Sequence, residues 1–193
     1  ASKTPDIAGR ESYKGSTYTT GLWPKEGVDF TGKRVAVIGT GSSAVQAIPE
    51  LAKMAKELYV FQRTPSSIDV RDDWPTDPNW ARKLKPGWQA KRRERVLAAV
   101  ERTPEQQAKL DAMSSDEKLR YQENQNIDYM MRIHRRIEKT VKDPQTAEAL
   151  KPWYMFMCKR PCFHNEYLPA FNLPNVHLVD TKGQGVTEIS PEG

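Results

Sequence analysis

The stretch that decides the fold is KRVAVIGTGSSAVQAIPELAKMAKELYVFQRTP, residues 33–65. Arg34 to Ile38 is a short apolar run rich in β-branched residues, which is typical of a buried strand. A glycine turn follows, then apolar residues at helical spacing, then a second apolar run from Leu58 to Phe61. This order predicts the first strand–helix–strand half of a nucleotide-binding α/β sheet.

The turn after the first strand has the pattern G-x-G-x-x-A. The first glycine permits a tight turn, the second lets the backbone approach a pyrophosphate, and the small alanine lets the helix pack on the strand. A serine at the helix start can act as its cap, where free N–H groups and the helix dipole favour an anion. Pro49 inside the helix predicts a kink or an irregular first turn. The predicted cofactor ligands of this segment are Gly39, Thr40, Gly41, Ser42, Ser43, Ala44 and Gln46, with Ser42 or Ser43 as the cap.

The end of the second strand indicates which nucleotide is bound. A site for NAD carries an Asp or Glu there, which holds the ribose 2′-hydroxyl. This chain instead has Arg63 and Thr64, with no acid to repel a 2′-phosphate, and an arginine can bind a phosphate bidentately. The pattern therefore predicts NADP, with Arg63 and Thr64 among its ligands. The alternative is a glycine turn in an unrelated α/β domain, with Arg63 as a solvated surface charge.

Composition narrows the function classes. The 193 residues suit one domain with an insertion, and no apolar stretch is long enough to span a membrane. The net charge is +5, but the basic residues form no single patch interleaved with aromatics, so nucleic-acid binding is not expected. Cys158 and Cys162 have neither redox-motif nor zinc-site spacing, so we expect reduced thiols in a cytoplasmic protein and no metal site. The chain starts without Met and ends in a turn-like sequence, which predicts a piece of a longer protein.

The remaining chain predicts loops, helices and returning strands around this unit. Residues 1–32 read as a loop leading to the first strand, and 66–150 as an irregular connector followed by a helical insertion. Residues 151–193 read as a loop and the strands that complete the sheet. The expected fold class is α/β, a Rossmann-like nucleotide-binding sheet flanked by helices, with a helical insertion. The expected helices are 89–101, 104–112, 115–141 and a short one after Pro144; the expected strands are Val176–Val179 and a hairpin arm over Val186–Ile189.

Three segments together resemble the NADP-binding domain of the Baeyer–Villiger monooxygenases, flavin enzymes that insert oxygen beside a ketone carbonyl. The first is the family fingerprint, F-x-G-x-x-x-H-x-x-x-W followed by P or D. The second is the Gly39–Ala44 turn with Arg63-Thr64-Pro65. The third is Cys158-Lys159-Arg160-Pro161-Cys162, followed by Tyr167 and residues 175–180. The fingerprint is matched by Tyr13, Gly15, Trp23 and Pro24, whereas Thr19 stands where the family has His.

The resemblance implies a division of roles. NADPH is bound by this domain, and FAD by a domain of the same parent chain that lies upstream in the family. Lys159 is similar in role to a second ligand of the 2′-phosphate, and Arg160 to the catalytic residue, whose fixed charge stabilises an anionic C4a-peroxyflavin and then the tetrahedral intermediate. The implied reaction converts a ketone substrate to an ester or lactone, and the isolated chain is expected to have no turnover. Two alternatives stay open: an N- or S-oxygenating flavin monooxygenase, and a non-catalytic NADP-binding module, to which Thr19 points.

Overall fold

The computed structural model describes residues 4–193. The chain divides into two compact units. The sheet unit comprises the residues up to Arg71 together with Tyr129–Gly193, and the helical insert comprises Asp72–Asp128. The expected α/β class is confirmed, because the sheet unit is built on a small parallel sheet that packs against helices.

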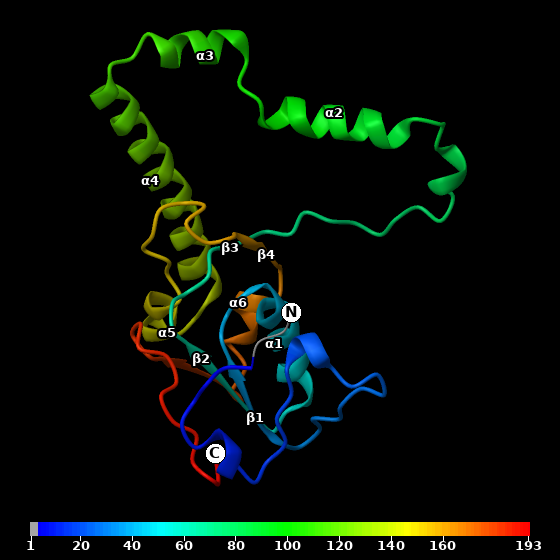
Figure 1. The fold of residues 1–193 in the computed structure, drawn as a ribbon, viewed down its shortest axis with the longest axis vertical. Coiled ribbons are helices and arrows are strands. Elements are labelled where there is room, and N and C mark those ends of the chain that lie inside the picture. Colours follow the sequence, from blue (N-terminus) through cyan, green and yellow to red (C-terminus); the bar gives the residue numbers. More distant parts are fainter. Residues whose placement is uncertain (1–3) are drawn as a thin grey trace. The chain divides into compact units, whose positions relative to one another are not determined.

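The main sheet has three strands, β1 (Arg34–Ile38), β2 (Glu57–Gln62) and β5 (Val176–Asp180), in the order β1-β2-β5 (Figure 1). All pairs are parallel, and the register aligns Ile38 with Phe61 and Phe61 with Val179. The carboxyl ends of the three strands therefore meet at one edge. The apolar runs predicted all three strands.

Helix α1 (Ser42–Met54) packs against β1, β2 and the short helix α6 (Tyr167–Ala170). Its apolar stripe enters the core together with the inward-facing residues of β2. The helix runs on through Pro49, which is itself buried. The core residues of this interface are Val45, Ile48, Leu51, Ala52, Leu58 and Val60.

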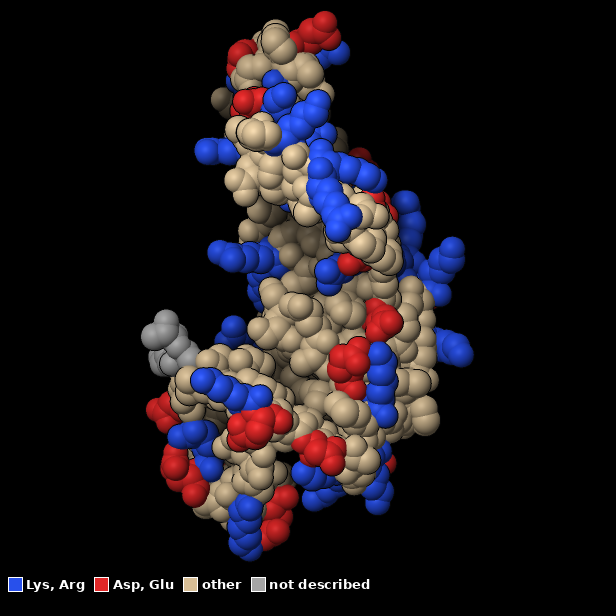
Figure 2. Space-filling view, turned by 90° about the vertical axis from the view of Figure 1, so that its right-hand side faces the viewer, with Lys and Arg blue, Asp and Glu red and all other residues tan. Residues whose placement is uncertain are grey.

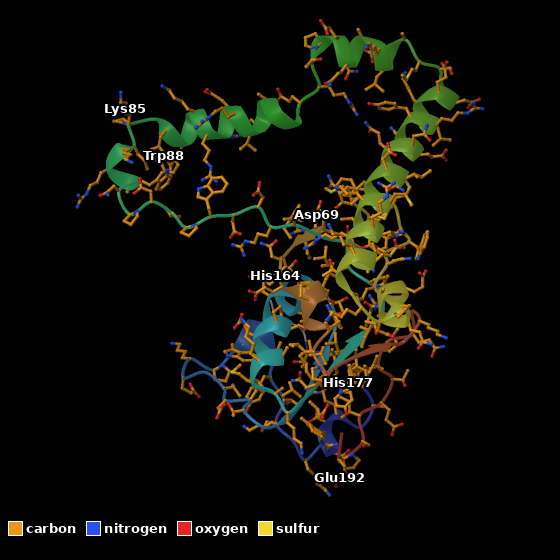
Figure 3. All side chains as sticks on the ribbon, turned by 180° about the vertical axis from the view of Figure 1, so that it is seen from behind. Asp69, Lys85, Trp88, His164, His177 and Glu192 are labelled. Atoms are coloured by element: carbon orange, nitrogen blue, oxygen red, sulfur yellow. The ribbon has the colours of Figure 1, made fainter. Side chains whose placement is uncertain are left out.

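The predicted helices of residues 88–149 are confirmed. Thr103 starts one of them with a capping box, since its hydroxyl accepts the Gln106 N–H at 3.2 Å and its own N–H donates to the Gln106 side chain at 2.9 Å. The last part of α4 belongs to the sheet unit, where Ile133 and Ile137 join the core. The helices are α2 (Trp88–Val100), α3 (Pro104–Asp111), α4 (Ser115–Thr140) and α5 (Pro144–Ala149). Short 3₁₀ helices are η1 (Arg10–Ser12), η2 (Thr20–Leu22) and η3 (Ala81–Lys83). Within the insert, Trp88, which is labelled in Figure 3, packs edge-on against Trp80.

A second, two-stranded sheet appears where the sequence predicted irregular chain. Strands β3 (Ile68–Asp69) and β4 (Cys162–Phe163) pair in parallel; Figure 3 labels Asp69, the last residue of β3, and His164, the residue after β4. Strands this short have no detectable period, so hydrophobic patterning does not reveal them.

The hairpin arm predicted over Val186–Ile189 is not an assigned strand within the described residues, and its predicted partner arm would follow residue 193. Within residues 4–193 this segment forms a single β-bridge, between Glu188 and Ala8, in the parallel sense. The turn at its end is present, because the Gly193 N–H donates to the Ser190 carbonyl at 3.1 Å.

The surface carries mixed charge. Figure 2 shows acidic and basic side chains interspersed over the face of the sheet unit that it presents. Among residues 4–193, no helix combines the length and the apolar character needed to cross a bilayer.

Candidate nucleotide-binding site

The presence of glycine at two positions of the turn after β1 has a different physical reason at each. Gly39 has a φ of 102°, which is strained for any L side chain, and its N–H donates to the Phe61 carbonyl at 2.9 Å. Gly41 has an ordinary φ of −76°, and a Cβ built on it would meet no described atom within 4 Å. Neither backbone nor packing requires glycine at position 41. Close approach by a ligand such as a pyrophosphate is a physical reason that fits.

The start of α1 is capped by Gly41, and the prediction of Ser42 or Ser43 as the cap is wrong. Both serines lie in the first helical turn. Because a glycine cap has no side-chain acceptor, the first N–H groups of the helix stay available to an anion. The Ser42 hydroxyl instead lies 3.7 Å from Cys162 Sγ, and the Ser42 carbonyl accepts Gln46 Nε2 at 3.1 Å.

Hydrogen bonds hold the glycine turn to the segment that follows β2. The buried Thr40 hydroxyl donates to the Thr64 carbonyl at 3.1 Å, and the Ser66 hydroxyl donates back to the Thr40 carbonyl. These bonds place Arg63 beside the turn. The Arg63 side chain runs along Gly185, at which a Cβ would lie 3.6 Å from Arg63 Cδ.

Lys159 approaches Arg63, and we refer to these two residues as the cation pair. Burial lowers the pKa of the Lys159 ammonium, and the positive charge of Arg63 lowers it further. Neither cation forms an ion pair with an acid among the described residues. Two neighbouring cations without an acidic partner are suited to a doubly charged anion such as a phosphate monoester.

A hollow of about 270 Å³ lies beside the first turns of α1. It joins two of the predicted ligands, Ser42 and Gln46, to the segment that directly follows Arg160. The Arg160 side chain is exposed and makes no hydrogen bond or ion pair within the part of the chain that the structure describes. Its guanidinium is therefore available to a ligand. The lining residues are Ser42, Val45, Gln46, Arg71, Pro161, Cys162 and Phe163.

The fingerprint segment packs locally. The Trp23 ring lies 5.8 Å from the Tyr18 ring and 5.9 Å from Phe30, which itself packs against the core. A Cβ at Gly15 would lie against the tip of the Tyr13 side chain, which is only partly buried and would have to move. Trp23 therefore has aromatic neighbours on one side, while 42% of its surface stays exposed.

Several residues of the site were not predicted from the sequence. Ser66 and Ser67 lie two and three residues after the predicted ligand Thr64, and this proximity in sequence was a usable signal. The sequence contains no such signal for Tyr154, because its position against Lys159 depends on how the loop folds. Of the predicted ligands, the structure brings together the Gly39–Gly41 turn, Arg63 and Thr64, and places Lys159 near Arg63. Ser42 and Gln46 line the adjoining hollow, and Ala44 packs against the core. The Ser43 side chain makes no hydrogen bond with the residues that the structure describes.

Comparison with known proteins gives relatives along the whole chain, although no family model matches it. The chain is 44% identical over 221 residues to Baeyer-Villiger monooxygenase ATR8 of Stachybotrys chlorohalonatus, covering 99% of this chain and 35% of that protein. The solved polycyclic ketone monooxygenase of Thermothelomyces thermophila matches with a TM-score of 0.81 and 37% identity, over 98% of this chain and 36% of that one. The solved complex of OTEMO with FAD and NADP matches with a TM-score of 0.75 and 32% identity, over 100% of this chain and 42% of that one. The chain spans about a third of the length of the curated relatives it matches.

Proposed function

We propose that this chain, similar along its whole length to Baeyer–Villiger monooxygenases, is the NADP-binding portion of an FAD- and NADPH-dependent enzyme of that kind. The observation that carries the proposal is the cation pair, Arg63 and Lys159, beside a glycine turn whose second glycine faces open space. A dinucleotide with a 2′-phosphate needs these two elements next to each other.

The residues fit NADP in two places. The Gly39–Gly41 turn and the first N–H groups of α1, which have no side-chain cap, would hold the pyrophosphate, and the cation pair would hold the 2′-phosphate. When bound, NADPH supplies a hydride and FAD, from the remainder of the parent chain, supplies oxygen activation. The present chain orients the dinucleotide and excludes water from it.

Arg160 is the proposed catalytic residue. Its guanidinium is exposed and has no partner within the described chain. In sequence, Arg160 directly precedes Pro161, which lines the hollow beside α1. A fixed positive charge there would stabilise the negative charge that develops on the carbonyl oxygen of a ketone substrate when a nucleophile adds to its carbon. Lysine would be a poorer substitute, because it lacks the planar fork of donors.

One solved relative is a polycyclic ketone monooxygenase, which favours ketone oxidation over N- or S-oxygenation and over a non-catalytic module. We assign residues 33–65 and 151–193 to the NADP-binding domain, 66–150 to its connector and insertion, and 1–32 to a linker. A cytoplasmic location is part of the same proposal.

The test is calorimetric titration of the purified chain with NADP⁺ and NAD⁺. Arg63→Ala should weaken NADP⁺ binding about 10- to 100-fold and leave NAD⁺ unchanged, because hydrogen bonds between charged groups contribute about 1.5–3 kcal/mol. Arg160→Ala should change either affinity little. Arg34→Ala, an exposed arginine at the amino end of β1, is the matched control. Equal affinity for the two nucleotides in the wild type, or binding of neither, would contradict the proposal.

A further inference from the structure

We propose that Tyr154 is a positioning residue for Lys159 and, through it, a determinant of the preference for NADP(H) over NAD(H). This inference rests on the proposed function. Lys159 Nζ lies 5.1 Å from the centroid of the Tyr154 ring, within the range of a cation–π interaction. Lysine has a long flexible stem, so a lysine without an ion-pair partner is spread over many rotamers. The ring limits this spread and holds the ammonium in one region.

The Tyr154 ring is itself fixed at its far end. Its hydroxyl oxygen accepts the Ser67 N–H at 3.0 Å. Ser67 is 2% exposed, and its side-chain hydroxyl lies 3.2 Å from the Tyr129 hydroxyl on α4. Burial raises the pKa of the Tyr154 phenol, so the group stays neutral at ordinary pH. The ring under Lys159 is thus part of the packed sheet unit.

The same anchor connects Tyr154 to Arg63. Ser67 belongs to the segment that begins at Arg63, and the Thr40 and Ser66 hydrogen bonds hold that segment to the glycine turn. One hydrogen-bonded assembly therefore sets the positions of the turn, of Arg63 and of the ring that carries Lys159. A loop lysine without such a support would retreat from a second cation, because like charges repel. Tyr154 keeps the cation pair assembled before the phosphate arrives, which reduces the ordering cost of binding.

The experiment measures NADP⁺ and NAD⁺ affinities of the purified chain in a double-mutant cycle. Tyr154→Leu should reduce the ratio of NADP⁺ to NAD⁺ affinity about 3- to 30-fold, with NAD⁺ affinity unchanged. Lys159→Met should reduce the ratio at least as much. In the Lys159→Met background, Tyr154→Leu should have no further effect on the ratio. Trp153→Leu, an aromatic of the same loop that contacts His134, is the control and should keep the wild-type ratio.

Each outcome decides the matter. A wild type that prefers NADP⁺ together with a Tyr154→Leu variant that keeps the full preference overturns the inference and leaves the proposed function standing. Additive losses in the double variant also overturn it, because the tyrosine would then act independently of Lys159. A wild type without preference overturns the proposed function and this inference with it.

A second measurement covers the case that Tyr154→Leu does not fold. In the wild-type chain, the Lys159 ε-methylene resonance, assigned by comparison with Lys159→Arg, should be shifted upfield by the ring current of Tyr154. Tyr154→Phe keeps the ring and should keep part of that shift. A Lys159 resonance at the position of an exposed lysine would overturn the inference.

Discussion

Replacing Arg136 by Met tests whether α4 holds the two short strands in place. Arg136 donates from Nη1 to the Ile68 carbonyl at 2.7 Å and from Nη2 to the His164 carbonyl at 2.8 Å. Burial lowers the pKa of this guanidinium, and the nearby Asp69 carboxylate partly offsets that effect. A hydrogen bond to a charged group contributes about 1.5–3 kcal/mol, and methionine keeps the length but donates nothing. Discounted for partial exposure, the expected loss in the free energy of unfolding is about 2–4 kcal/mol.

The assay is urea unfolding followed by far-UV circular dichroism. With a slope of about 1–3 kcal/mol per molar urea, the midpoint of Arg136→Met should fall by about 1–2 M at unchanged slope. Arg135→Met changes the exposed neighbour on the same helix and should stay within about 0.5 kcal/mol of the wild type. A loss below about 1 kcal/mol for Arg136→Met, or one equal to that of the control, would refute the reasoning.

Three further predictions concern single side chains. Gly39→Ala should cost about 1–3 kcal/mol of stability because of its positive φ, whereas Gly41→Ala should leave the thermal midpoint unchanged and weaken NADP⁺ binding; the reverse ranking would contradict both assignments. Tyr167→Phe should increase the free energy of unfolding by about 1 kcal/mol and so raise the urea midpoint, because the buried hydroxyl has no hydrogen-bond partner among the described residues. A lowered midpoint would contradict this and indicate that the hydroxyl has a partner. The hydrogen bond from Lys151 lowers the pKa of Glu138, so its stabilisation is present above the usual glutamate pKa and is lost as the pH falls through the lowered value. Lys151→Met should therefore lower the thermal midpoint near about pH 7 and have little effect near about pH 2, and an equal effect at both would argue against the ion pair.

The sheet and the helices were readable from the sequence because their signals are local. The runs that became β1, β2 and β5 are apolar and bounded by turn residues, and Thr103 with Gln106 is a complete capping box. The resemblance drawn from the motifs is confirmed by relatives that match nearly the whole chain, one of them at 44% identity. Such motifs can be identified without knowledge of the packing, because each one is required locally by a turn, a helix cap or a ligand.

The errors came from features that depend on partners far along the chain. The segment at Val186 has the composition of a strand, but the described structure gives it one bridge, to Ala8, from the other end of the sequence. Strands β3 and β4 exist because each completes the other, and neither has a pattern of its own. The cap of α1 depends on backbone geometry at Gly41, which serine-rich sequence does not reveal.

The ion pair between Arg132 and Asp69, 2.5 Å long, has a consequence for how the length of this chain can vary in evolution. It joins the last part of α4 to β3, so within the sheet unit the chain on either side of residues 72–128 is fastened together. The entropy of closing a loop grows only with the logarithm of its length, about 0.6 kcal/mol for each doubling. Residues 72–128 can therefore be lengthened, shortened or exchanged with little effect on the positions of Arg63 and Lys159. Natural insertions and deletions should concentrate in this segment.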